Sequence, residues 1–119
     1  MAENSSGRTG RPNRYLPLVT AICRAQGWPE PEAEVCLIPG RRFRCDLVWR
    51  AARLVVEVQG GVWGRRGGHT GGQAQIDDME KLNLLQLAGF TVLQVTPRQV
   101  VNGALTSLLA GTIGSAVWR

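Results

Sequence analysis

Two acidic residues, Asp46 and Glu57, stand in neighbouring apolar, β-branched stretches near the centre of the chain. If these stretches pair as an antiparallel hairpin centred between Ala51 and Ala52, paired residue numbers sum to 103 and Asp46 lies opposite Glu57. Directly opposed side chains have Cβ atoms about 5 Å apart. Two carboxylates at that distance repel each other, and a divalent cation between them removes the repulsion. The spacing therefore predicts a metal site.

The chemistry of the oxygen ligands favours Mg²⁺, with Mn²⁺ as a substitute. The backbone carbonyl of Val58 is the third candidate ligand. Such an ion polarises a phosphodiester and lowers the pKa of an attacking water, so we expect a metal-dependent phosphodiesterase. The alternative is that Asp46 and Glu57 are two unrelated surface carboxylates on a half-exposed sheet.

Side-chain alternation along the two stretches supports the pairing. Glu57 and Gln59 share one face of their strand, together with Val55. Apolar residues of the hairpin point to the other face: Leu47, Trp49, Leu54, Val56 and Val58. Because Ala51-Ala52 is not a favoured two-residue turn, the register depends on this alternation.

Basic residues are concentrated around these carboxylates. The formal charge is +5, and 13 of the 14 basic residues are arginines. Residues 39–66 hold seven arginines against two acids. Guanidinium groups match phosphate oxygens in geometry, so we expect a nucleic-acid-binding surface. Its expected members are Arg41, Arg42, Arg44, Trp63, Arg65 and Arg66; the alternative is an arginine-rich composition without a binding role.

The remaining sequence predicts one α/β (α+β) domain over 14–119, a mixed sheet flanked by helices, after a flexible basic tail over 1–13. The predicted order is α-β-β-β-α-β-α: a helix over 14–26, strands over 34–38, 42–49 and 53–59, a helix over 73–88, a strand over 90–95 and a helix from 97 to 110. A glycine-rich loop is expected over 60–72, and Thr96 to Gln99 predicts a capping box. The expected buried side of the 73–88 helix is Ile76, Met79, Leu82, Leu85 and Leu87.

Three cysteines, Cys23, Cys36 and Cys45, lack CxxC spacing and have one histidine to support them, so buried thiols are favoured over a disulfide or a zinc site. The chain has no apolar run of about 18 residues and no secretory signal, so we expect no membrane span and a location in the cytoplasm, that of the host if the protein is phage-encoded.

The acidic pair belongs to a recognisable pattern. Asp46, followed after ten residues by Glu57-Val58-Gln59, resembles the PD-(D/E)xK nuclease superfamily over roughly residues 15–110. Val58 to Trp63, and the stretch from Asp78 and Lys81 to Leu93, are similar to very-short-patch repair endonucleases. Small phage endonucleases have a similar pattern of residues, here Glu57, Gly60, Gly61 and Trp63 followed by Gly68-His69-Thr70. VRR-NUC domains and Holliday-junction resolvases resemble the chain more distantly. The resemblance implies a restriction-endonuclease-like fold.

Two positions depart from the superfamily pattern. Cys45 replaces a proline, and Gln59 stands where the superfamily has a lysine. A replacement cation would be Lys81, or Arg65 or Arg66 in the loop. The alternative for Lys81 is a helix-surface pair with Asp77, worth only a few tenths of a kcal/mol.

Other polar residues are further candidates. His69 is expected to protonate the leaving oxygen, contact the phosphate or act as general base, or else is a solvated loop histidine. Asp78 either supports the ligands or is a helix-surface charge. Trp63 either stacks on a base or anchors the loop.

Together these features predict a metal-dependent endodeoxyribonuclease acting on branched, nicked or mismatched DNA in repair or recombination. The expected catalytic residues are Asp46, Glu57, Gln59, His69 and Lys81. A junction resolvase would be a symmetric homodimer, whereas a mismatch nicker works as a monomer. The alternative function is a catalytically inactive DNA-binding module that retains the fold, as Gln59 would allow.

Overall fold

The computed structural model describes the backbone of residues 13–60 and 67–114 and the side chains of 13–60 and 72–114. Its core is a four-stranded mixed sheet with strand order β1-β2-β3-β4. The elements are α1 (Leu16–Gln26), β1 (Glu32–Val35), β2 (Cys45–Trp49), β3 (Leu54–Val58), α2 (Gly67–Leu87), β4 (Thr91–Val95), α3 (Pro97–Val101) and α4 (Ala104–Ala110). The predicted α+β class is confirmed.

The β2–β3 hairpin has the predicted register. Val48 pairs with Val55 and Trp49 with Leu54, so paired residue numbers sum to 103. The connection is a loop of residues 50–53 rather than a two-residue turn, and it closes through the Arg53 N–H, which donates to the Arg50 carbonyl at 3.0 Å. Arg53 takes a left-handed backbone with φ of 51° at the end of this loop. This geometry removes the need for a favoured turn dipeptide at Ala51-Ala52.

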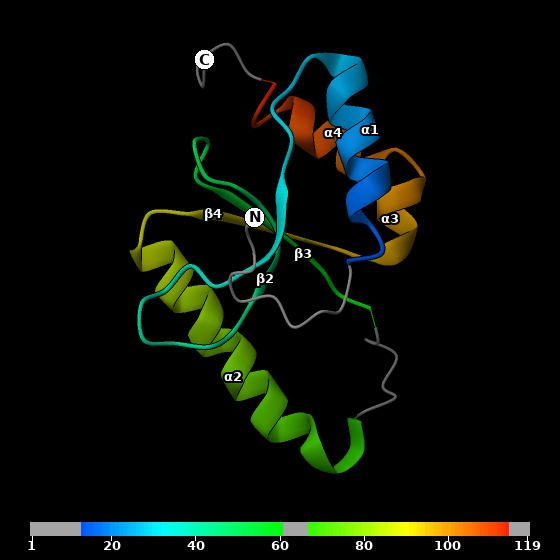
Figure 1. Ribbon diagram of the computed structural model, residues 1–119. Coiled ribbons are helices and arrows are strands. Elements are labelled where there is room, and N and C mark those ends of the chain that lie inside the picture. The colour runs from blue at the N-terminus through cyan, green and yellow to red at the C-terminus, as the bar shows by residue number, and fades with distance from the viewer. Residues whose placement is uncertain (1–12, 61–66, 115–119) are drawn as a thin grey trace.

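Helices cover both faces of the sheet (Figure 1). α1, α3 and α4 pack on one face, where Leu47, Trp49, Leu54 and Val56 meet residues such as Val19 and Leu105. α2 packs on the other face, where Leu85 contacts a smaller cluster with Val48 and Val55. The alternation predicted for β3 is confirmed, since Val55 and Val56 belong to clusters on opposite faces.

The predicted strand bounds differ from the observed ones at the start of the sheet. β1 covers Glu32–Val35 instead of 34–38, and β2 begins at Cys45 instead of 42. Residues 36–44 form an irregular connection that turns at Gly40, whose φ is +81°. Glu34 has a left-handed φ of 56°, which is rare for residues other than glycine.

Helix α2 differs most from the sequence prediction. It begins at Gly67, so the predicted loop over 60–72 is wrong for its last six residues. Its predicted buried side is also largely wrong, because Ile76, Met79 and Leu87 are 54%, 57% and 84% exposed, whereas Leu85 is buried. A helix of 21 residues is about 30 Å long, roughly twice the length of a five-residue strand. Its first half therefore extends beyond the sheet (Figure 1).

The C-terminal segment forms two helices instead of the single predicted one. The capping box at Thr96 and Gln99 is present and begins α3. Gly103, with φ of 94°, separates α3 from α4. At the N-terminal end, the predicted helix is confirmed as α1, which has Pro17 in its first turn and ends at left-handed Gly27. Within 13–60 and 67–114 no helix combines the length and apolarity needed to cross a bilayer.

Candidate active site

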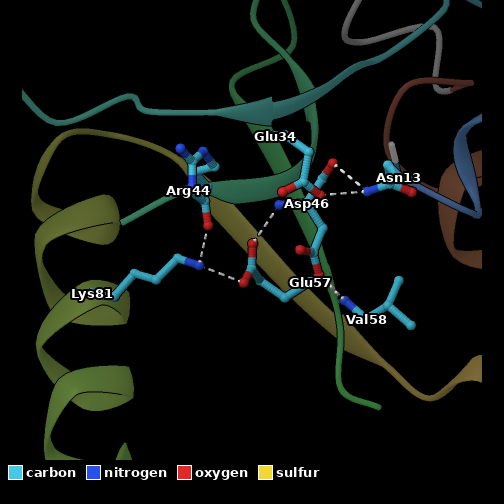
Figure 2. A network of polar contacts seen from close by, with 7 residues as sticks. All are labelled: Asn13, Glu34, Arg44, Asp46, Glu57, Val58 and Lys81. Atoms are coloured by element: carbon cyan, nitrogen blue, oxygen red, sulfur yellow. Dashed lines mark hydrogen bonds and ion pairs between the residues drawn. The ribbon is translucent and has the colours of Figure 1, made fainter. Parts of the chain in front are cut away.

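Asp46 and Glu57 meet where the β2–β3 ladder ends. The Asp46 N–H donates to Glu57 Oε2 at 3.0 Å, and the Val58 N–H donates to Asp46 Oδ2 at 2.7 Å (Figure 2). Each carboxylate thus accepts a hydrogen bond from the backbone of the other strand. Glu57 is 8% exposed, the only buried charged residue among those described. The structure therefore brings together the two carboxylates that the sequence pairs.

Lys81 reaches this pair from α2. Its Nζ atom lies 2.6 Å from Glu57 Oε1 and 2.6 Å from the Arg44 carbonyl oxygen (Figure 2). The alternative of a surface pair with Asp77 is wrong, because Lys81 points into the site and Asp77 Oδ1 accepts from Gln73 Nε2 instead. Lys81 is therefore a positive charge held within the candidate site.

Burial alone would lower the pKa of the Lys81 ammonium, but the charge of Glu57 and its hydrogen bond outweigh this effect, so the pKa of Lys81 is raised. The ammonium stays charged at neutral pH. It supplies a fixed positive charge beside Glu57.

Asp46 has a raised pKa of about 6. Burial is the largest cause, followed by repulsion from Glu57, while the hydrogen bond from the Val58 N–H acts in the opposite direction. A carboxylate that is costly to ionise in this way is stabilised by any cation that binds beside it.

Two contributors to the site were missed by the sequence analysis. Asn13 Nδ2 donates to Glu34 Oε2 at 2.9 Å and to the Asp46 carbonyl oxygen at 3.0 Å (Figure 2). Its Oδ1 atom accepts from the Tyr15 N–H at 2.9 Å. Asn13 thus joins the start of α1 to β1 and β2, although it was assigned to the flexible tail. Asn13 does not cap α1, whose N-cap residue is Tyr15. Its bond to the Tyr15 N–H is an Asx turn, a typical role of asparagine just before a helix, and this signal could have identified it.

Gln59 and Asp78 lie close to the ion pair. With Glu57, Lys81, Leu82, Leu85, Val92 and Gln94 they line a small pocket of about 20 Å³, roughly the space of one water molecule. Gln59 is fixed at the end of β3, where its N–H donates to the Val95 carbonyl at 2.7 Å. The structure therefore places these two candidates beside Glu57.

The arginines of the 39–66 stretch lie in different surroundings. Arg41, Arg42 and Arg44 line a cleft of about 640 Å³ between residues 40–44 and α2. Arg53 instead caps α2, with its guanidinium against the Ala88 and Gly89 carbonyls and 4.5 Å from the centre of the Phe90 ring.

Three predicted residues, Trp63, Arg65 and Arg66, lie outside the described residues, as do residues 1–12 of the predicted tail. The backbone of His69 belongs to helix α2 and not to the expected loop, and its side chain is outside the described part of the chain.

The donors present fit a hard divalent ion. Asp46 and Glu57 supply carboxylate oxygens, and the Val58 carbonyl accepts from the Gly60 N–H at 3.0 Å while retaining a second lone pair. Mg²⁺ commonly uses one or two protein carboxylates and takes its other ligands from water or substrate phosphate. Among residues 13–60 and 72–114 no group of three His, Cys, Asp or Glu side chains is arranged for a metal, so such an ion would depend on non-protein ligands.

Two of the three cysteines are buried. Burial raises the pKa of Cys45 to about 12, and burial also raises the pKa of Cys23. The prediction of buried thiols is wrong for Cys36, which is exposed. Its sulfur instead lies 3.5 Å from the Arg42 carbonyl oxygen in the irregular 36–44 connection.

No protein-family model, curated protein or solved structure matches this chain.

Proposed function

We propose that the protein is a divalent-metal-dependent endodeoxyribonuclease of the PD-(D/E)xK type. The observation that carries this proposal is the convergence of Asp46, Glu57 and Lys81 at the end of the β2–β3 ladder. Two carboxylates and an ammonium in a partly buried site match the charge requirements of phosphodiester hydrolysis. The element order around them agrees with the core expected from the resemblance.

Asp46, Glu57 and the Val58 carbonyl would hold the metal ion. When bound, the ion supplies Lewis-acid activation of the phosphate and of the attacking water. The Asp46 N–H keeps the Glu57 carboxylate oriented, and the Val58 N–H does the same for Asp46. These two hydrogen bonds fix the carboxylates before substrate arrives, which lowers the cost of organising the site.

Lys81 would supply the positive charge that the neutral Gln59 amide lacks. Its ammonium would stabilise negative charge that develops on the phosphate, while the Gln59 amide would orient a water by hydrogen bonding. The position of Lys81, 2.6 Å from Glu57 Oε1, favours an active enzyme over the alternative of an inactive DNA-binding module.

The decisive experiment is incubation with supercoiled plasmid in Mg²⁺ or Mn²⁺. We expect nicking or linearisation by the wild type that disappears in chelator and in Glu57→Gln. The matched control is Glu32→Gln, because Glu32 is an exposed carboxylate on β1 of the same sheet and pairs with Arg50 at 2.7 Å. If the protein binds DNA but does not cleave it with either metal ion, the proposed nuclease activity is wrong and the DNA-binding module is favoured.

A further inference from the structure

The cleft beside the candidate site has features that the proposed cleavage reaction does not use. It lies between the 40–44 segment and the described part of α2, and its volume is about 640 Å³, within the range of pockets that hold drug-sized ligands. Lys81 lines both this cleft and the small pocket at Glu57. A group bound in the cleft therefore lies next to the candidate site.

The two walls of the cleft carry opposite charges. The 40–44 wall contributes Arg41, Arg42 and Arg44, and the helix wall contributes Asp77, Asp78 and Glu80. Arg41 and Glu80 form an ion pair of 2.8 Å between the walls. Phosphates alone would be attracted by one wall and repelled by the other. A ligand with an anionic end and an amine-bearing end matches both.

An aromatic ring also lines the cleft. Phe43 lines the cleft, with the Arg41 guanidinium 5.4 Å and the Lys81 ammonium 5.9 Å from the ring centre. Aromatic side chains in basic grooves stack on the bases of single strands. Carboxylates accept hydrogen bonds from base amino groups, as cytosine N4 provides.

We propose that this cleft binds an unpaired nucleotide of a DNA strand, with its phosphate toward the arginines, its base on Phe43 and a base amino group toward the acidic wall. The proposal rests on the proposed nuclease function and specifies its substrate class: DNA with a single-stranded flap, loop or end at the cut. In a continuous duplex the base is stacked and paired, and exposing it costs a few kcal/mol.

The test measures binding in chelator, where no metal-dependent cleavage occurs. Fluorescence anisotropy compares a labelled single strand, the matched duplex and the same duplex with a single-stranded flap. We expect the single strand and the flap to bind more tightly than the duplex. Phe43→Leu keeps an apolar side chain but removes the ring, so it should weaken flap binding roughly tenfold, with little effect on the duplex.

Phe43→Tyr keeps a ring for stacking and should bind the flap within about twofold of wild type. Arg24→Ala is the charge control, because Arg24 is exposed, pairs with Glu30 and does not line the cleft. Equal affinity for flap and duplex, or equal losses for both in Phe43→Leu, would overturn the proposal. Plasmid cleavage that requires Glu57 tests the nuclease function separately, so a failure of the flap preference is distinguishable from a failure of the nuclease function itself.

Discussion

The Lys81 ammonium lies 2.6 Å from Glu57 Oε1, although the two residues are 24 positions apart in the chain and belong to a helix and a strand. Both side chains are largely buried, at 15% and 11% exposure. Removing one charge from such a pair leaves the other without compensation. This relationship provides the most direct test of how the site is built.

Lys81→Met should lower the free energy of unfolding by about 3 kcal/mol, because Glu57 then stays buried without a counter-charge. Glu57→Gln should also destabilise, but the double variant should recover part of the loss because the unpaired charge is gone. Urea unfolding in chelator measures all three. Additive losses in the double variant would show that the two groups do not interact energetically.

Mg²⁺ or Mn²⁺ should raise the melting temperature of the wild type. An ion present at about 100 times its dissociation constant stabilises by about 2.7 kcal/mol. Asp46→Asn should lose most of this shift because one ligand charge is absent. Glu30→Gln, which alters an exposed carboxylate paired with Arg24, should keep it. If the metal ion raises the melting temperature of Asp46→Asn as much as that of the wild type, the ion does not bind at Asp46.

Protein stability without metal should depend on pH through Asp46. Its folded pKa of about 6 lies above the ordinary value of 3.8, so the folded state holds this proton more tightly than the unfolded state. The contribution of Asp46 is therefore most favourable below about pH 4 and is lost as pH rises through about 6. In chelator, Asp46→Asn should gain stability relative to wild type, on the order of 2 kcal/mol between pH 4 and 7.

Thermal or urea unfolding of both proteins across this range provides the measurement. A difference that does not change with pH would mean that Asp46 has the same proton affinity in the folded and unfolded chains.

Asn13→Ala should weaken metal binding roughly tenfold, the usual effect of removing a residue that supports a ligand. Asn13 acts through the Asp46 carbonyl and the Glu34 carboxylate, so it is a positioning residue. Asn102→Ala removes a similar side-chain-to-backbone hydrogen bond, at the start of α4. It should cost comparable stability and leave the Mn²⁺ affinity unchanged. Equal Mn²⁺ affinities in the two variants would mean that Asn13 contributes to stability but not to metal binding.

The hairpin could be predicted because its information is local. Alternation of polar and apolar residues and the symmetry about Ala51 and Ala52 fix the register, and the register alone brings Asp46 and Glu57 together. Likewise Gly27 and Gly89 lie within one turn of the helix ends that they mark, and the Thr96 capping box lies at the start of α3.

Features that depend on long-range geometry could not be predicted. Choosing Glu57 over Asp77 as the partner of Lys81 requires the rotation of α2 about its axis, which its mixed apolar pattern does not encode. The early start of α2 runs against the low helix propensity of glycine at positions 67, 68, 71 and 72. Asn13 and Glu34 become part of the site only once α1 and β1 lie beside β2.

Arg53 has a further consequence for α2. Its guanidinium donates to the Ala88 and Gly89 carbonyls just after the helix and stacks on Phe90. Leu85, in the last turns of the helix, is buried against the sheet. The C-terminal end of α2 is therefore held by two sets of contacts. Lys81 lies one helical turn before Leu85, and its neighbour Glu80 is paired with Arg41 at 2.8 Å. The ammonium is thus presented to Glu57 from the part of α2 that these contacts hold in place.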